Sequence, residues 1–290
     1  MTIIYFLSPT GIDITKKCLE HYLQHLKVSS SVFSLTTNYS EQINKEYLKL
    51  ILPDDVTNPD FYAGLRHRAD HHHFYFFRKP TDLPGQGIIA FDMDSTFVEE
   101  EGVDEIARRL GISEKITALT REAMEGKIDF DTSFTRRIGM LKGTHKDILH
   151  QVCEQMTLSP GLKTILPIFK EKGFKTAIIS GGLDIFTERL KEKYQLDYAF
   201  SNSVRIQEDR LTDKITFPIM NAEKKKQTLI NLATELSICR ENIIACGDGA
   251  NDIPMLLHAG NGVAWKAKPK TREKVANQLI LMVSSRFSSL

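Results

Sequence analysis

Short apolar runs alternate with segments of helical periodicity from Gly87 onward. The four runs cover Ile88–Met93, Lys175–Ile179, Asn242–Cys246 and Gly262–Trp265. Runs of this length, alternating with amphipathic helices, are typical of a parallel sheet covered by helices on both faces. The pattern therefore predicts an α/β fold with a Rossmann-like parallel sheet as its core.

The interval between the first two runs, residues 97–174, has little strand character. Its apolar residues recur at helical spacing in three stretches, Ile106–Leu110, Ile116–Met124 and Phe134–Leu141. We therefore predict a helical cap inserted after the first core strand, at about residues 98–160, with boundaries good to a few residues.

The first part of the chain follows a different pattern. Thr2–Leu7 resembles a strand, Ile12–Leu26 carries apolar residues on one helical face, and Val28–Leu35 alternates like a half-buried strand. Lys79–Gly85 contains prolines and a glycine, which is typical of a linker. We predict a small α+β N-terminal domain over residues 1–84 and a second domain, which contains the parallel sheet, over residues 85–290.

The composition of the chain argues against a nucleic-acid-binding protein and against a membrane protein. Hydrophobic residues make up 41% and charged residues 26%, and the net charge is +1, so a nucleic-acid partner is not expected. The longest apolar stretches, such as Leu279–Val283, are far shorter than the ~18 residues of a membrane-spanning helix. No basic segment precedes an apolar run near Met1, and the four cysteines have no CxxC spacing. We therefore expect a cytoplasmic protein with reduced thiols and no membrane partner.

Polar residues stand where three of the apolar runs end. Asp92 and Asp94 end the first run, Ser180-Gly181-Gly182 the second, and Gly247–Asp252 the third. Three lysines, Lys224–Lys226, lie between the second and third groups. Each group alone could be a solvated loop, a solvated helix face or a helix-entry turn. Because the carboxyl ends of parallel strands meet at one edge of a sheet, all four in this order predict one site.

These residue types suit phosphoryl transfer. Two carboxylates two positions apart, such as Asp92 and Asp94, are costly unless a cation or a shared proton compensates them. Hard carboxylate oxygens favour Mg²⁺, which also contacts a substrate phosphate. A carboxylate can act as a nucleophile and form an aspartyl-phosphate, while a lysine and a serine hydroxyl neutralise and position the phosphoryl oxygens.

The four groups resemble the motifs of the haloacid dehalogenase-type phosphatases, in the order in which that superfamily has them. The resemblance implies that Asp92 is the nucleophile and Asp94 the general acid/base. It implies that Mg²⁺ is held by Asp92, the backbone carbonyl of Asp94, and Asp248. The resemblance also implies residues that hold phosphate or substrate, or that orient other groups. These are Ser180, Gly181, Gly182, Lys225, Asn251 and Asp252. Lys225 is assigned by its spacing of 23 residues before Asp248, so Lys224 and Lys226 stay as alternatives.

The cap resembles one family of that superfamily, the phosphoserine phosphatases. The matching stretches are Glu101–Ala107, Thr120–Phe130, Ser133, Arg136-Arg137 and Leu141–Gly143, in a resemblance that runs from about residue 87 to about residue 278. It implies that Glu101 pairs with the substrate ammonium and Arg137 with its carboxylate, while Met124 and Phe130 close over the small side chain. A zwitterionic amino acid does need an anion and a bidentate cation.

Two features depart from this resemblance. Gly102 stands where family members often have a larger residue, which predicts a looser entrance to the site. The N-terminal residues match no family. Some phosphoserine phosphatases begin with an amino-acid-binding regulatory domain of βαββαβ type, and a degenerate, ACT-like form of it fits the strand–helix–strand start. A structural or dimerising role fits equally, so a homodimer is a further expectation.

The sequence thus predicts a Mg²⁺-dependent enzyme that hydrolyses O-phosphoserine, a small-molecule substrate, to serine and phosphate in the last step of serine biosynthesis. A phosphatase for another small phosphomonoester would keep the four motifs without needing Glu101 and Arg137. An inactive regulator would be expected to lose Asp92, Asp94 or Asp248, and all three are present.

Overall fold

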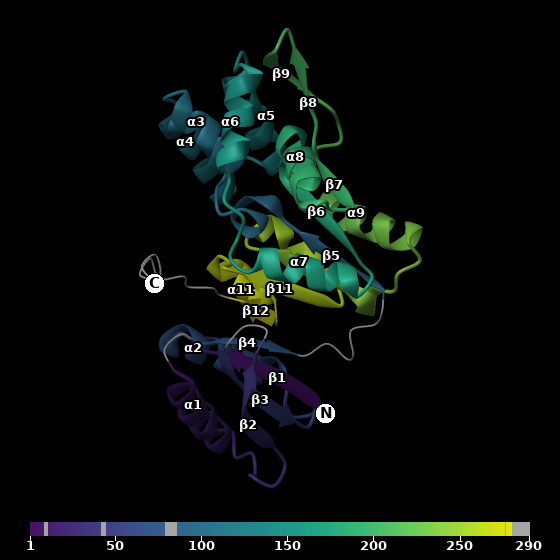
Figure 1. Ribbon diagram of the computed structural model, residues 1–290. Coiled ribbons are helices and arrows are strands. Elements are labelled where there is room, and N and C mark those ends of the chain that lie inside the picture. The colour runs from purple at the N-terminus through teal and green to yellow at the C-terminus, as the bar shows by residue number, and fades with distance from the viewer. Residues whose placement is uncertain (9–10, 42–44, 79–85, 276, 280–290) are drawn as a thin grey trace. The chain divides into compact units, whose positions relative to one another are not determined.

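The computed structural model describes residues 1–8, 11–41, 45–78, 86–275 and 277–279 (Figure 1). The chain divides into two compact units, one formed by Met1–Leu83 with Val263–Leu290 and the other by Pro84–Gly262. The expected linker Lys79–Gly85 lies outside the described residues, and so does the expected boundary at residue 84. All four polar groups singled out above belong to the unit Pro84–Gly262.

The unit Pro84–Gly262 is built on parallel strands in the order β10–β5–β6–β7. These are β5 (Gly87–Phe91), β6 (Phe174–Leu183), β7 (Tyr198–Asn202) and β10 (Ile243–Gly247). Every residue of β5 and of β10 is buried. Strands of a parallel sheet that is covered on both faces read as continuous apolar runs, which is how β5 and β10 read in the sequence.

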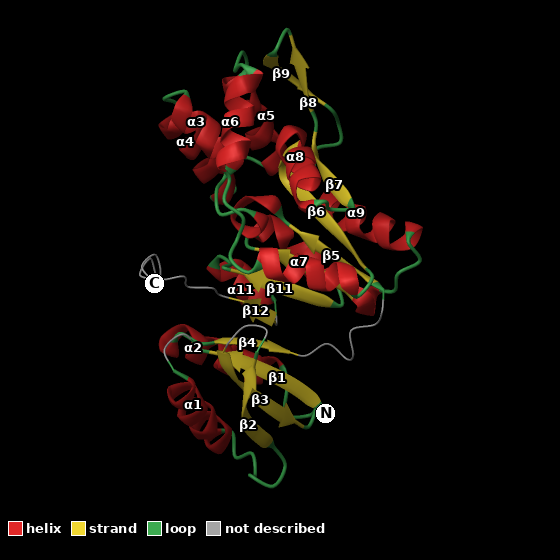
Figure 2. Ribbon diagram, viewed as in Figure 1, coloured by secondary structure: helices red, strands yellow, loops and turns green. Residues whose placement is uncertain are grey.

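Helices alternate with these strands along the chain (Figure 2). They are α7 (Leu162–Glu171), α8 (Asp184–Tyr194), α9 (Ala222–Glu235) and α10 (Ile253–His258). Helices α7, α8 and α9 pack against β6, and α10 packs against β10. The predicted α/β fold with a Rossmann-like parallel core is therefore confirmed.

A helical insertion follows β5, as predicted. It contains α3 (Gly102–Arg109), α4 (Ser113–Met124), α5 (Phe130–Leu141) and α6 (Lys146–Gln155), which lie together at the top of Figure 1. A hairpin of β8 (Val204–Gln207) and β9 (Arg210–Ile215) joins it, because the Gly143 N–H donates to the Leu211 carbonyl at 2.8 Å. The sequence analysis did not predict this hairpin, since most of its side chains are polar and exposed.

Residues 1–78 fold in the order β1 (Thr2–Leu7), α1 (Ile12–His25), β2 (Ser34–Ser40), β3 (Lys45–Leu52), α2 (Pro59–His72) and β4 (Tyr75–Arg78). The strands are antiparallel, in the order β2–β3–β1–β4. The strand expected over Val28–Leu35 begins only at Ser34. Val28 and Phe33 instead pack on the core from the loop before it, which explains the apolar positions there.

The core of this unit comes from alternate strand residues and from α1 and α2. Ile4, Phe6, Leu48 and Leu50 are each 0% exposed. The C-terminal segment completes the unit with α11 (Pro269–Lys274) and β12 (Asn277–Leu279). Strand β12 pairs parallel with β11 (Asn261–Trp265), and its Gln278 pairs antiparallel with Phe76 of β4. In the described parts of the chain, no helix combines the length and the apolar character that crossing a membrane requires.

We expect Leu48→Ala to destabilise the unit that contains Met1–Leu83 by about 2–5 kcal/mol, because it leaves a cavity in a filled core. Hydrogen–deuterium exchange of the full chain should then rise in residues 1–78 and stay unchanged in residues 86–262. Ile14→Ala is the control, since Ile14 is 52% exposed on α1. An equal rise in both units would contradict a separate N-terminal domain.

Candidate active site

The end of β5 forms the floor of the site. The Asp92 N–H donates to the Cys246 carbonyl of β10 at 2.8 Å, which fixes the two strand ends side by side. The chain then turns sharply through Met93–Phe97, with Ser95 in the left-handed region at φ 54°. The Met93 N–H donates to Asp92 Oδ1 at 2.7 Å, so the side chain of Asp92 is held in one orientation.

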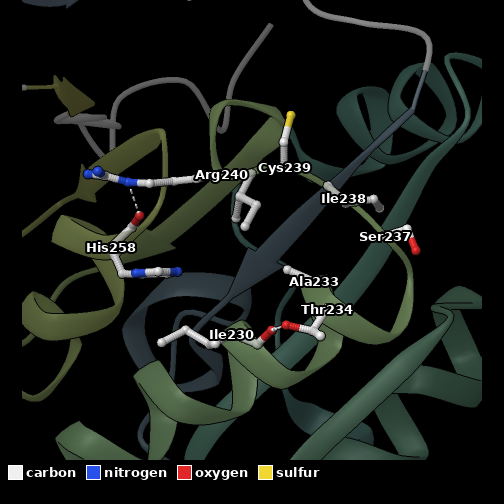
Figure 3. A pocket seen from close by; sticks show the side chains of 9 residues that line it. Ile230, Ala233, Thr234, Ser237, Ile238, Cys239, Arg240 and His258 are labelled. Atoms are coloured by element: carbon white, nitrogen blue, oxygen red, sulfur yellow. Dashed lines mark hydrogen bonds between the residues drawn. The ribbon is translucent and has the colours of Figure 1, made fainter.

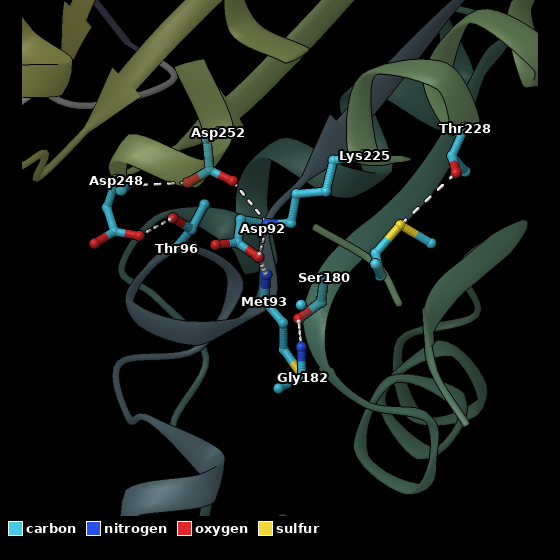
Figure 4. A network of polar contacts seen from close by, with 12 residues as sticks. Asp92, Met93, Thr96, Ser180, Gly182, Lys225, Thr228, Asp248 and Asp252 are labelled. Atoms are coloured by element: carbon cyan, nitrogen blue, oxygen red, sulfur yellow. Dashed lines mark hydrogen bonds and ion pairs between the residues drawn. The ribbon is translucent and has the colours of Figure 1, made fainter. Parts of the chain in front are cut away.

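A buried ammonium joins three elements at this point (Figure 4). Lys225 on α9 is 0% exposed, and its Nζ lies 2.7 Å from Asp92 Oδ1 and 2.7 Å from Asp252 Oδ1. Asp252 Oδ2 also accepts the Gly249 N–H at 2.9 Å. Lys226 pairs with Glu223 instead. Lys225 is therefore the lysine of the run that reaches the carboxylates.

Three buried carboxylates gather around this ammonium. One oxygen each of Asp92, Asp248 and Asp252 lie within 4.8 Å of one another, whereas Lys225 supplies one positive charge. Burial raises the pKa of Asp92 well above its ordinary value and Asp252 adds to the rise, while Lys225 opposes it. Burial alone would lower the pKa of Lys225, but Asp252 and Asp92 outweigh it and raise that pKa. A buried excess of carboxylate oxygens fits a hard divalent cation.

The loop after β10 is shaped by its glycines. A Cβ on Gly247 would come within 2.6 Å of the Asp252 side chain, so only glycine leaves room for that carboxylate. A Cβ on Gly249 would come within 2.3 Å of Asn251 Oδ1. Asp248 is buried, and the Thr96 hydroxyl donates a long hydrogen bond of 3.5 Å to its Oδ1.

The end of β6 faces the second aspartate of the first motif. Ser180 is 0% exposed, and its Oγ accepts the Gly182 N–H at 2.9 Å. A Cβ on Gly182 would lie 3.1 Å from Asp94 Oδ2, which places that carboxylate against this end of β6. Burial, then the Glu101 carboxylate, raise the pKa of Asp94 to about 7. A carboxyl group with that pKa can both release and take up a proton near neutral pH.

The cap contributes side chains to the same region. The Phe130 ring approaches Gly181, because a Cβ there would lie 3.1 Å from Phe130 Cζ. Burial lowers the pKa of Arg137, and the carboxylates of Asp104, Asp94 and Glu101 oppose it. Glu101 Oε1 accepts the Ser95 hydroxyl at 2.8 Å. Met124 ends α4, but its side chain lies outside the described part of the structure.

Gly102 does not open the entrance, contrary to the expectation from sequence. It is buried, and a Cβ on it would lie 2.8 Å from the Phe186 ring and 3.0 Å from Met156 Cε. The room that a larger residue would take is filled by Phe186 and Met156. The Gly102 N–H also donates to Asp94 Oδ1 at 2.8 Å, so the start of α3 holds the second aspartate in place.

Comparison with known proteins assigns this arrangement to a family. The family model of the haloacid dehalogenase-like hydrolases matches residues 87–260, which is more than half of the chain. The chain belongs to the haloacid dehalogenase-like hydrolases. It is 41% identical over 181 residues to a phosphoserine phosphatase of Archaeoglobus fulgidus, and 37% identical over 187 residues to one of Methanocaldococcus jannaschii. These matches cover 62% and 64% of this chain.

The length of the relatives differs. The chain spans 53% of the Archaeoglobus protein, and 89% of the Methanocaldococcus protein.

Among solved structures, a haloacid dehalogenase family hydrolase of Salmonella enterica serovar Typhi has 60% identity and a TM-score of 0.90, covering 97% of this chain and 95% of that one. A phosphoserine phosphatase solved as a phospho-aspartyl intermediate analogue has 36% identity and a TM-score of 0.63, covering 68% and 94%.

Several polar residues around this hydrolase site were not predicted from sequence. The Asn202 Nδ2, for example, donates to the Gly181 carbonyl at 2.8 Å. Asn221 caps α9 by accepting the Lys224 N–H, and its Nδ2 donates to Asp131 of the cap at 3.1 Å. Asn221 could have been found, because asparagine is a preferred N-cap residue. Asn202 ends a strand that the apolar pattern did not reveal.

A pocket of about 450 Å³ lies elsewhere in this unit (Figure 3). Its lining includes Ile230, Ile243, Arg240 and His258, and none of the four motifs contributes to it. The Arg240 guanidinium donates to the carbonyls of His258 and Leu257, so two of its donors are already used in holding α10. The pocket is therefore separate from the hydrolase site.

We expect Lys225→Met to destabilise the metal-free protein by about 3–5 kcal/mol, because it leaves two buried carboxylates without their cation. Urea denaturation in EDTA measures this. Lys226→Met is the matched control one residue along α9, and it should change stability by less than about 0.5 kcal/mol. Equal effects of the two substitutions would show that the ion triad does not hold this site together.

Proposed function

We propose that the chain is a Mg²⁺-dependent phosphoserine phosphatase that works through an aspartyl-phosphate on Asp92. The observation that carries the choice of substrate is Arg137. Its Nε is buried and has no hydrogen-bond partner among the described residues. Burial lowers the pKa of Arg137, while the carboxylates of Asp104, Asp94 and Glu101 oppose that change. A buried guanidinium donor without a partner is costly, and the carboxylate of a bound amino acid would satisfy it.

The relatives support the same proposal. The curated proteins of Archaeoglobus fulgidus and Methanocaldococcus jannaschii are phosphoserine phosphatases, and one similar structure represents a phospho-aspartyl intermediate of such an enzyme. The acidic cluster supplies the hard oxygen ligands that Mg²⁺ prefers. We assign the metal to Asp92, Asp248 and the Asp94 carbonyl. Asp252 uses one oxygen for Lys225 and the other for the Gly249 N–H, so we assign it to orienting the lysine.

In the first step, an oxygen of Asp92 attacks the phosphorus atom of phosphoserine. The bond between phosphorus and the serine oxygen breaks, and that oxygen takes the electron pair. Asp94 gives its proton to this oxygen, which releases serine and leaves the phosphoryl group on Asp92. Lys225, the Ser180 hydroxyl and the Gly181–Gly182 backbone hold the phosphoryl oxygens, with Asn251 beside them. Bound Mg²⁺ supplies further positive charge for the same oxygens.

In the second step, Asp94 accepts a proton from water, and the water oxygen attacks phosphorus. The bond to Asp92 breaks, which returns the carboxylate and releases phosphate. The raised pKa of Asp94, about 7, suits a group that alternates between acid and base. Glu101 on the cap would receive the substrate ammonium, and Phe130 and Met124 would enclose its methylene group.

The proposal also covers the cellular compartment of the enzyme and the role of its N-terminal residues. We assign it to the cytoplasm, in serine biosynthesis. The N-terminal residues, with their βαββαβ order, are the candidate for a regulatory or dimerising role. Strand β2, at the end of their sheet, has no charged residue, and an edge strand without charges favours pairing with another chain.

A phosphatase for another small phosphomonoester is the alternative, because the strand-end residues alone do not select serine.

We expect Asp92→Asn to abolish turnover of phosphoserine in Mg²⁺ while the protein stays folded, since the covalent route loses its nucleophile. Phosphate release measures turnover, and circular dichroism checks the fold. Wild type in EDTA should be inactive and should recover when Mg²⁺ is added. Near-normal hydrolysis by the variant would rule out this role of Asp92.

We expect Arg137→Ala to reduce kcat/KM for phosphoserine, with a loss of transition-state stabilisation of about 2–4 kcal/mol, because a charge-assisted bidentate contact is lost. The loss should be far smaller for p-nitrophenyl phosphate, which has no carboxylate. Arg136→Ala is the matched control, because Arg136 directly precedes Arg137 in the chain and is exposed. Equal losses on both substrates would show that Arg137 serves the fold or the phosphate. A wild type that hydrolyses other phosphomonoesters and not phosphoserine would favour the alternative.

A further inference from the structure

The peptide between Gly181 and Gly182 lies at the edge of the proposed phosphoryl site. Its N–H, on Gly182, donates to Ser180 Oγ at 2.9 Å, as Figure 4 shows. A Cβ on Gly182 would lie 3.1 Å from this hydroxyl and 3.1 Å from Asp94 Oδ2. The N–H therefore faces the groups that handle the phosphoryl group.

The carbonyl of the same peptide is held from the other side. Asn202, the last residue of β7, is 2% exposed, and its Nδ2 donates to the Gly181 carbonyl at 2.8 Å. Its Oδ1 accepts the Met220 N–H at 2.7 Å. The Gly181 carbonyl can only accept a hydrogen bond and the Met220 N–H can only donate one, so these two neighbours determine the orientation of the Asn202 amide.

A peptide held at its carbonyl is also held at its N–H. In a planar trans peptide the two groups point in opposite directions, so the bond from Asn202 directs the Gly182 N–H toward the site. Glycines on both sides give this peptide unusual freedom to rotate. After a half-turn it would present a carbonyl oxygen, and that oxygen would repel a phosphoryl anion instead of binding it.

The second hydrogen bond of Asn202 reaches the helix that carries Lys225. Met220 directly precedes Asn221, the N-cap of α9. Its Sδ accepts the Thr228 hydroxyl of that helix at 3.7 Å. The amide of Asn202 thus links the end of β6 to the beginning of α9. The proposed function assigns groups on both elements to the phosphoryl oxygens.

We propose that Asn202 is a positioning residue for phosphoryl binding. Its side-chain amide keeps the Gly182 N–H directed into the site and ties the end of β6, Ser180–Gly182, to the start of α9. The inference rests on the proposed function only in that Ser180–Gly182 and Lys225 bind the phosphoryl group. It does not depend on which alcohol the phosphate is attached to.

The test uses the full chain with Mg²⁺ and orthophosphate as the probe. Asn202→Asp keeps an acceptor for the Met220 N–H and places a carboxylate oxygen against the Gly181 carbonyl. Asn202→Ala removes both bonds without adding charge, and it serves as the second variant should Asn202→Asp not fold. Ser201→Ala is the matched control, because Ser201 precedes Asn202 on β7 and bonds to Thr187 of α8 at 2.7 Å.

Calorimetry should show orthophosphate affinity at least tenfold lower in a folded Asn202 variant, and unchanged within twofold in Ser201→Ala. Turnover of p-nitrophenyl phosphate should fall with it, while the Mg²⁺ concentration for half-maximal activity stays the same. Orthophosphate affinity within twofold of wild type would overturn the inference. So would parallel losses of phosphate and Mg²⁺ affinity, which indicate general loosening. If wild type binds orthophosphate but does not hydrolyse phosphoserine, the proposed substrate fails and the role of Asn202 stands.

Discussion

The buried ion triad of Asp92, Lys225 and Asp252 is the interaction on which the site depends. Its members come from the end of β5, from α9 and from the loop after β10, so it fixes three elements at one point. An ammonium with 0% exposure is tolerated only because two carboxylate oxygens lie 2.7 Å away. Gly247 then has to lack a side chain, because Asp252 occupies that space. The geometry of the neighbouring backbone follows from this one cation.

The residues that we propose for chemistry and those that we propose for recognition come from different parts of the unit Pro84–Gly262. The strand ends provide the carboxylates, while the helical insertion provides Phe130 and Arg137. Asp131 connects the two, since it accepts the Asn221 amide at the start of α9. A hydrolase built in this way can keep its reaction and change its substrate by changing the insertion alone.

The sequence was informative where a local pattern has one structural meaning. Buried parallel strands must be apolar, and their carboxyl ends converge, so Asp92, Ser180 and Asp248 could be placed in one site before any coordinates. The hairpin β8–β9 was not predicted, because its strands are short and most of their residues are exposed, so the apolar runs that revealed the core strands do not occur there. Gly102 was misread, since its role depends on Phe186, which lies 84 positions away along the chain. Asn202 was missed for the same reason, as its partners are backbone groups of distant residues.

One compact unit is assembled from two separate stretches of the sequence, because Val263–Leu290 groups with Met1–Leu83. During synthesis on the ribosome, the N-terminal strands therefore emerge long before β12, which pairs with β4. The residues of Pro84–Gly262 are all made before that partner exists. The unit Pro84–Gly262 can thus complete its fold during translation before β12 is made, whereas β4 gains its pairing with β12 only after both units' other strands have emerged. A premature stop codon ahead of β12 would therefore remove a strand partner from β4, which is encoded far upstream of it.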